Sequence, residues 1–445
     1  MGGGDAWQQY ADAAEAGFSA TLLASARTYA DSVGSAAVVA VYRGHVIAAW
    51  GDVARRIPAH SVRKGFVSAL YGTAVARGEL SLDATLADHG IDDIAGLTET
   101  ERSARLRDLV AARSGVYLPA AYAPNDQDET RPKRGSHAPG THWFYNNWDF
   151  NVAGVIIERA TGSDLYELFD ARIAQPAGME DYRPADGLRV LEPSRSRHPA
   201  HTFSVSARDM ARFGQLYLQR GRWGDRQVLP AEWIRESTRA HSQFDDGSGY
   251  GWMWWTYEAG AAALGDGYPN LSAVDLYMAR GTGGQAIFVI PAAELVIVHR
   301  GDTDNNRPVI GAHAWGLAER ILAARTGDPV AQPRLTSLTP TPLASQLPPA
   351  TLPRFITLER AALERLVGSY ELAPGVNVRV FLHDGRAFIN VPGEGEAEMY
   401  ALTADEFTIR VQAGVGIRFE SDADGSVTGV VLTLGPQTMR ARRRR

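Results

Sequence analysis

Two residues of this sequence are well suited to covalent chemistry, Ser61 and Lys64, which are separated by a Ser-x-x-Lys spacing. Only two of the 45 lysines and arginines are lysines, Lys64 and Lys133, so a lysine at this position stands out against the composition. The spacing puts both side chains on one face of a helical turn. A desolvated lysine amine can accept a proton from a serine hydroxyl near neutral pH, whereas an arginine stays charged in a protein. The pair therefore predicts a serine nucleophile with a lysine base.

The elements around this pair favour the same interpretation. Residues 36–42 and 46–50 are predicted strands joined by a glycine turn, and an apolar helical run follows Ser61 from Phe66 to Val75. A serine at the N-terminus of a buried helix has an exposed hydroxyl. It also has nearby backbone N–H groups that can bind an oxyanion.

Two further motifs complete a candidate site. Tyr145-Asn146-Asn147 offers a second proton-handling group, and Arg280 begins the glycine-rich run Arg-Gly-Thr-Gly-Gly-Gln. With Ser61 and Lys64, these motifs resemble in order and approximate spacing the active-site motifs of the serine β-lactamase and penicillin-binding-protein superfamily. The Tyr-x-Asn motif resembles its class C β-lactamase-like branch. Within that branch, the chain resembles the esterases, D-aminopeptidases and 6-aminohexanoate-oligomer hydrolases.

The resemblance implies a serine hydrolase that cleaves an amide or ester through an acyl-enzyme. Ser61 would attack the carbonyl, with Lys64 and Tyr145 as general base and acid. A neighbouring ammonium is expected to lower the pKa of Tyr145, so that the two groups titrate together. Asn147 would orient Lys64 or the substrate, and the backbone N–H of Ser61 would share an oxyanion hole with the third motif. The substrate and oxyanion residues would be Asn147, Arg280, Gly281, Thr282 and Gly283.

The third motif departs from the pattern of the superfamily. Its Lys-Thr-Gly lysine, which helps to hold a substrate carboxylate, has no counterpart, because no lysine follows Lys133. Thr282-Gly283 can be aligned with Gly281 at the lysine position, or Arg280 can lie nearer to it. Arg280 then either binds a carboxylate or is turned away by strand alternation. This departure favours an amide or ester of a smaller or less anionic acyl group over a β-lactam.

Several alternatives stay open. The protein could be a slow-acylating penicillin-binding or sensor-type protein, or a non-catalytic scaffold. Taken singly, Tyr145 could be a core aromatic and Asn147 a turn residue. A cluster of aromatic residues suits either a wall of the cleft or a packed core corner: Tyr250, Trp252, Trp254, Trp255 and Tyr257. Asp302 and Asp304 indicate a turn rather than a metal site.

The composition excludes several classes of binding partner and cofactor. The net charge of −6, with mixed signs, gives no broad basic field for nucleic acid. The absence of cysteine excludes thiolate chemistry, and no histidine spacing indicates a metal site, so we expect no cofactor and a small-molecule amide or ester substrate. No apolar stretch has the length of a membrane span. Residues 1–7 lack the pattern of an export signal, which fits either a cytoplasmic protein or an exported one after signal removal.

The order of predicted elements gives an α+β fold class. We expect an antiparallel sheet flanked by helices with a helical subdomain, β-lactamase-like, over residues 1–328. Strands at 36–50 and 272–300 would join in one sheet, around helices near 10–30, 61–78, 150–161, 206–220 and 308–326.

A different pattern begins towards the C-terminus. Residues 329–355, with seven of the 23 prolines, predict a linker. Residues 356–445, with two Asp-Gly turns, predict a small antiparallel β-domain that resembles a lipocalin-like barrel. If the protein forms a homo-oligomer, we expect the subunits to meet through this domain. The arginine run at 440–445 is predicted to be a solvated tail.

Overall fold

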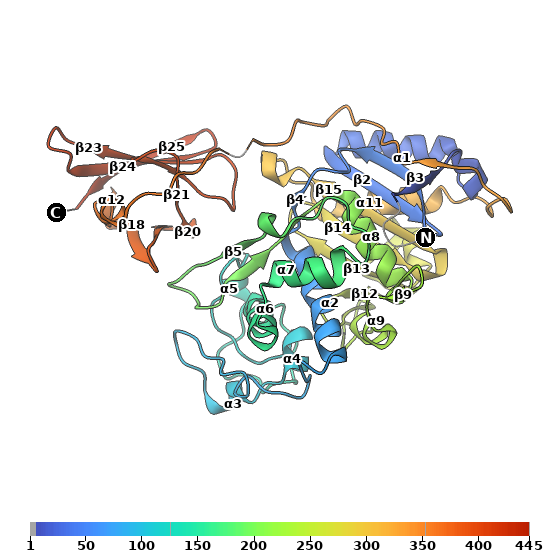
Figure 1. The fold of residues 1–445 in the computed structure, drawn as a ribbon, viewed down its shortest axis with the longest axis horizontal. Helices are drawn as coiled ribbons and strands as arrows, with labels where there is room; N and C mark the ends of the chain where they lie inside the picture. The colour runs from blue at the N-terminus through green and yellow to red at the C-terminus, as the bar shows by residue number, and fades with distance from the viewer. Residues whose placement is uncertain (1–5, 125, 352, 445) are drawn as a thin grey trace.

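Two large sheets organise the chain, as Figure 1 shows. All of their strand pairs are antiparallel except that of β1 (Gln8–Tyr10) with β3 (His45–Gly51), which is parallel. The computed structural model describes residues 6–124, 126–351 and 353–444. Residues 1–5, on which the expectation about an export signal partly depends, lie outside these ranges. Within them, no helix has both the length and the apolar character needed to cross a bilayer. The arrangement of helices around one large sheet, followed by a β-domain, confirms the predicted α+β fold class.

The larger sheet joins early strands to late ones. β15 pairs antiparallel with β2 in its centre, so the two predicted strand regions do meet in one sheet. The sheet has ten strands in this spatial order: β10 (Ser242–Gln243), β11 (Ser248–Tyr250), β12 (Trp255–Tyr257), β13 (Leu276–Gly281), β14 (Gln285–Ile290), β15 (Leu295–Gly301), β2 (Ser35–Tyr42), β3 (His45–Gly51), β1 (Gln8–Tyr10) and β16 (Leu335–Ser337).

Helices cover both faces of this sheet. The five longest are α1 (Ala20–Ser32), α2 (Arg63–Ala76), α6 (Asn147–Thr161), α8 (Ala207–Leu218) and α11 (Gly311–Ala323). The last four match the predicted helical regions closely. The first predicted helix, near 10–30, begins ten residues too early, because the end of β1 and a short 3-10 turn at Ala13–Ala16 precede α1. The shorter ones are α3 (Glu99–Arg102), α4 (Leu106–Val110), α5 (Gln127–Thr130), α7 (Leu165–Phe169), α9 (Ala231–Ser237), α10 (Pro269–Ser272) and α12 (Arg360–Glu364). Short ladders join β4 (Ile57–Pro58) to β7 (Ser204–Val205), β5 (Leu188–Val190) to β6 (Ala200–Thr202) and β8 (Arg222–Trp223) to β9 (Arg226–Gln227).

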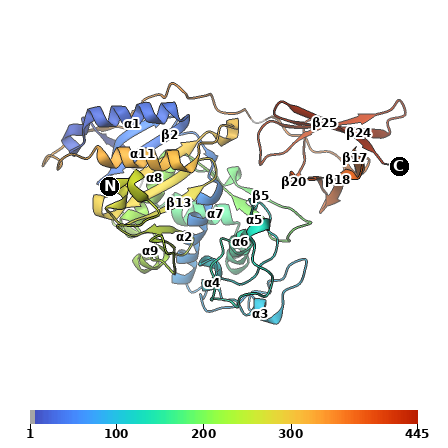
Figure 2. The same ribbon diagram turned by 180° about the vertical axis from the view of Figure 1, so that it is seen from behind.

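Side-chain alternation along β2 explains the layers. Val38, Ala40 and Tyr42 belong to a core shared with α1 and α11, which lie side by side in Figures 1 and 2. Val39 and Val41 point to the opposite face and pack in the core that includes α2 and α8. A strand buried on both faces reads as a continuous apolar run, which is what residues 36–42 show.

The C-terminal β-domain is a second sheet with its own core. Its nine strands follow the order β20 (Gly395–Glu398), β19 (Arg386–Val391), β18 (Val376–His383), β17 (Gly368–Ala373), β25 (Gln437–Arg443), β24 (Val427–Leu434), β23 (Val415–Ser421), β22 (Glu406–Thr408) and β21 (Tyr400–Ala401). The arginine run predicted as a solvated tail at 440–445 is not a tail, because Arg440–Arg443 belong to β25, which lies between β17 and β24. Arg445 lies outside the described residues. Ala441 is fully buried there while Arg440 and Arg442 are exposed, so alternation keeps these arginines in water.

The proline-rich segment 329–355 makes contacts with the larger sheet. Its strand β16 pairs with β1, and Thr341 forms a bridge with Trp50. Leu343 is buried in the core beneath α1 and α11. The first half of this segment is therefore held against the sheet before the chain reaches the C-terminal β-domain.

Candidate active site

Ser61 and Lys64 meet where a short helical turn becomes α2. Ser61 lies in the 3-10 turn η2 (His60–Val62), which runs directly into α2, so Lys64 stands on the first turn of the helix. Lys64 Nζ is 2.8 Å from Ser61 Oγ. Ser61 is partly exposed and lines a cavity of about 410 Å³, while Lys64 is only 2% exposed. The predicted pair is thus assembled, with the hydroxyl facing the cavity and the amine behind it.

The surroundings of Lys64 favour its neutral form. Burial lowers the pKa of Lys64 well below its usual value, and the nearby charge of Arg63 lowers it further. No carboxylate among the described residues forms an ion pair with the amine. An amine of this kind can accept the proton of a serine hydroxyl at moderate pH.

Tyr145 completes the contact around the nucleophile. Tyr145 lines the same cavity as Ser61, and its ring lies beside Lys64, with 4.6 Å between Nζ and the ring centroid. The expectation that its pKa would be lowered is wrong. Burial raises the pKa of Tyr145, and this outweighs the opposing hydrogen bond from Ser61 and the charges of Arg63 and Arg280. This shift favours the protonated phenol of Tyr145 in the resting site.

Asn147 lies near this group but makes a different contact from the predicted one. It is the first residue of α6, after Asn146, whose side chain caps the helix by accepting from the Trp148 N–H. Asn147 Nδ2 donates to the Tyr122 carbonyl at 2.7 Å, and no hydrogen bond to Lys64 is found in the described part of the chain. Its buried Oδ1 has no partner among the described residues.

The third motif lies against the backbone of the nucleophile. At Gly281, where β13 ends, an added Cβ would lie 2.9 Å from the Ser61 nitrogen and 2.7 Å from the Ala59 oxygen. Only glycine lets the strand approach this closely. The register that puts Gly281 beside Ser61 is therefore the one adopted. Gly283, with φ of 77°, makes the turn that follows, and Thr282 lines the same cavity as Ser61.

Arg280 is directed into the cavity rather than away from it. It lines the same space as Ser61, and its guanidinium carbon lies 3.9 Å from the centroid of Trp255. The two are diagonal neighbours on one face of the sheet, because Trp255 pairs with Met278. Arg280 is exposed and has no ion-pair partner within the described ranges.

The aromatic cluster divides between cavity and core. Trp255 separates the Ser61 cavity from an adjoining one of about 560 Å³, which Tyr257 also lines. The second cavity is lined by the aromatic residues Trp143, Phe244, Tyr268 and Trp315 and also by the polar residues Asp246, Ser248 and Arg280. Trp254 is instead fully buried against Tyr217, and Trp252 packs on Trp233. Both interpretations of the cluster are therefore correct, each for different residues.

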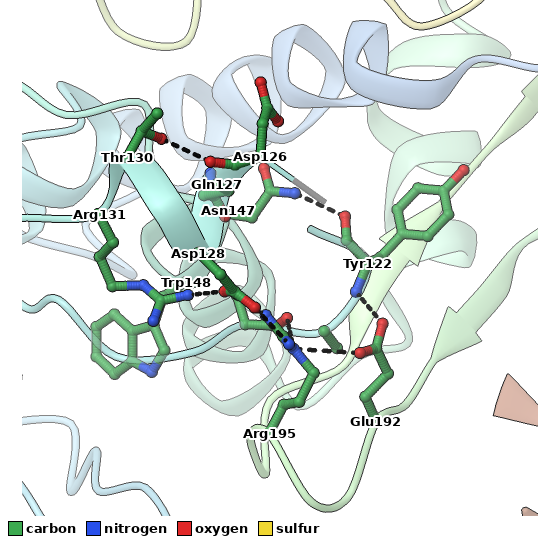
Figure 3. Close-up of polar contacts among 12 residues, drawn as sticks. Tyr122, Asp126, Gln127, Asp128, Thr130, Arg131, Asn147, Trp148, Glu192 and Arg195 are labelled. Carbon is green, nitrogen blue, oxygen red and sulfur yellow. Dashed lines mark hydrogen bonds and ion pairs between the residues drawn. The ribbon is translucent and has the colours of Figure 1, made fainter. Parts of the chain in front are cut away.

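Tyr122, which connects these parts, was not among the predicted site residues. Its hydroxyl lies 2.8 Å from His60 Nδ1, and its carbonyl accepts the Asn147 bond. Figure 3 shows that its backbone N–H donates to Glu192, at 2.7 Å. Tyr122 and His60 both have positive φ, of 56° and 48°. Position alone, directly before Ser61, could have drawn attention to His60.

The acidic loop is part of the framework. Arg55 forms ion pairs of 2.6 Å with both Asp302 and Asp304, and Arg55 and Asp302 are buried. This pairing agrees with the prediction of a turn. It fixes the loop that carries Thr303, whose hydroxyl lies 3.1 Å from His60 Nε2.

Sequence comparison identifies the class of protein to which this fold and site belong. Residues 22–300 match the Beta-lactamase family. The chain belongs to this family, whose members are serine hydrolases, and the predicted resemblance is confirmed.

Individual relatives share only part of their length with this chain. It is 34% identical over 143 residues to a D-aminopeptidase of Brucella anthropi, and the aligned region covers 28% of this chain and 25% of the relative. It is 32% identical over 167 residues to esterase EstB of Burkholderia gladioli, which covers 32% of this chain and 40% of the relative. Each match thus spans less than half of the curated relative.

A solved structure resembles the whole chain in fold. The octameric penicillin-binding protein homologue from Pyrococcus abyssi superimposes with a TM-score of 0.50 at 16% identity. The superposition covers 94% of this chain and 99% of the other. The likeness therefore extends beyond the family match at residues 22–300.

Proposed function

We propose that the protein is a serine hydrolase that cleaves an amide or ester bond through an acyl-enzyme on Ser61. The observation that carries the proposal is the 2.8 Å contact between Ser61 Oγ and the buried amine of Lys64. A neutral amine at this distance can take the hydroxyl proton as the oxygen attacks a carbonyl.

The remaining groups supply the other steps. The oxyanion formed by attack would be bound by the backbone N–H of Ser61 and an N–H of the 281–284 turn. The leaving group would depart with a proton from the Tyr145 hydroxyl, which Lys64 then restores. Water would release the acyl group by the same transfers in reverse, so that Lys64 and Tyr145 end as they began.

The cavities indicate the substrate class. The aromatic residues of the second cavity suit an amide or ester with an apolar substituent. Arg280 suits a substituent that carries one acidic or carbonyl-rich group. The missing lysine of the third motif argues against efficient β-lactam hydrolysis. The names of the two relatives, D-aminopeptidase and esterase, fit the same division between amide and ester substrates.

The test is covalent labelling with a fluorescent fluorophosphonate, with Ser61→Ala as the matched control. In parallel, hydrolysis of p-nitrophenyl butyrate, a D-alanyl p-nitroanilide and nitrocefin is followed. We expect labelling that is lost in Ser61→Ala, with turnover of the ester or the anilide. A stoichiometric burst without turnover would favour the sensor-type alternative, and labelling that does not depend on Ser61 would exclude the proposal.

A homo-oligomer through the C-terminal β-domain remains part of the proposal. The relative of similar fold from Pyrococcus abyssi is described as octameric. Light scattering of the full chain at several concentrations measures the state directly, and a monomer at all of them would contradict this part.

A further inference from the structure

One segment touches three parts of the candidate site. Residues 120–124 and 126–131, here called the bracing segment, contain Tyr122 and the short helix α5. Gln127 of α5 is buried and donates to the Tyr145 carbonyl at 2.6 Å. Tyr122 bonds Asn147 through its carbonyl and His60 through its hydroxyl. The backbone carbonyl of Tyr145 and the side chains of Asn147 and His60 are therefore all held by this one segment.

The bracing segment is in turn clamped by the loop 192–195 (Figure 3). Glu192 accepts the Tyr122 N–H, and its other oxygen lies 3.3 Å from Arg195. Arg195 binds both oxygens of Asp128 at 2.7 and 2.8 Å and also donates to the Ala120 carbonyl at 3.0 Å. The loop thus forms hydrogen bonds with the segment at three places, Ala120, Tyr122 and Asp128 of α5.

Glu396 of the C-terminal β-domain forms a hydrogen bond with this loop. Glu396 of β20 accepts the backbone N–H of Ser194 at 3.1 Å. It is 7% exposed although it stands on a short strand of the smaller sheet, and its second oxygen has no partner in the described part of the chain. Its charge acts on both Glu192 and Arg195. Burial raises the pKa of Glu192 to about 7, and Glu396 adds to that rise.

We propose that the C-terminal β-domain positions the active site: Glu396 holds the 192–195 loop, which fixes the bracing segment against Tyr145, Asn147 and His60. Glu396, Glu192 and Tyr122 are positioning residues and do not touch substrate. The inference rests on the proposed function for its kinetic consequences, whereas its structural consequence is independent of any substrate.

The test uses three variants of the full chain. Glu396→Ala removes the acceptor, Glu396→Gln keeps an oxygen that can accept the Ser194 N–H, and Glu394→Ala is the control at an exposed position of the same hairpin. Loss of one buried hydrogen bond changes the equilibrium constant between the held and released forms of the loop by a factor of about five. We expect Glu396→Ala to lower kcat for p-nitrophenyl butyrate about fivefold, with little change in KM. The rate is divided by the number of active sites, counted as the Ser61 residues that the fluorophosphonate labels. Glu396→Gln should restore kcat, and Glu394→Ala should match the wild type.

Hydrogen exchange provides the readout that needs no turnover. Peptides from 118–131 should exchange faster in Glu396→Ala than in the wild type, Glu396→Gln or Glu394→Ala. Tyr122→Phe, which removes only the bond to His60, should lower kcat without changing the exchange of the 192–195 loop. Equal exchange and equal kcat in wild type and Glu396→Ala would overturn the inference. An inactive wild type with faster exchange in Glu396→Ala would overturn the proposed function and leave the inference standing.

Discussion

The amine of Lys64 lies between the rings of Tyr145 and Phe150, with centroids at 4.6 and 4.9 Å. Aromatic faces attract an ammonium by about 0.5–2 kcal/mol, which would favour the protonated form. Taking an unpaired ammonium out of water costs more than this. The balance agrees with the lowered pKa and gives the rings a second role, which is to keep water from the amine.

This balance predicts the acid limb of the pH profile. Because the proposed mechanism needs the neutral amine, kcat/KM should rise with pH through the lowered pKa of Lys64 and stay level above it. A lysine with its ordinary pKa would still be mostly protonated at about pH 9, so kcat/KM would still be rising there. Lys64→Arg should cost about 10² to 10⁴-fold in kcat, since arginine cannot give up its proton. Steady-state rates from pH 5 to 10 measure both effects, and an active Lys64→Arg enzyme would contradict the role of the base.

Gly281→Ala should lower kcat. The new methyl group would press on the Ser61 nitrogen, where an oxyanion would bind. Removing one oxyanion donor typically costs about 10² to 10³-fold in kcat. Circular dichroism should show an intact fold. Gly267→Ala, where an added Cβ has open space, should leave kcat unchanged, and equal rates for both variants would refute this use of the third motif.

At the scale of elements, α2 is anchored by Phe66, two residues after Lys64. Its fully buried ring packs on Phe169, Phe203 and Phe213, with centroids 5.1, 5.3 and 4.8 Å away. Phe66→Ala should lower the free energy of unfolding by about 3–5 kcal/mol, because the ring leaves a cavity that rigid neighbours cannot fill. Chemical denaturation measures the loss. A change below about 1 kcal/mol would mean that the cluster can collapse.

Sequence patterns predicted most elements but not the contacts between loops. The continuous apolar run of β2 and the periodic helices α2 and α8 are local signals, and they were found within a few residues. β25 was missed because its arginines look like a solvated tail until strand pairing buries Ala441. Ser61, Lys64 and Tyr145 were found through their motifs. Tyr122 was not, since its role comes from a peptide group that any residue carries.

The whole molecule has separate cores in its two sheets, joined by the proline-rich segment and the Glu396 contact. Independent cores unfold as independent units when the contact between them is small. Calorimetry of the full chain should therefore show two transitions. A single transition with equal calorimetric and van't Hoff enthalpies would show one cooperative unit instead.

The pairing of β2 with β15 also sets the order of events during synthesis. β2 leaves the ribosome early, but its partner at residues 295–301 is made on the order of ten seconds to a minute later, at about 5–20 residues per second. Until then, the β2–β3 hairpin exposes both an apolar face and an open strand edge. The nascent chain is thus most exposed to aggregation before its length passes residue 301, and we expect its yield in cells to depend on chaperones that shield this hairpin.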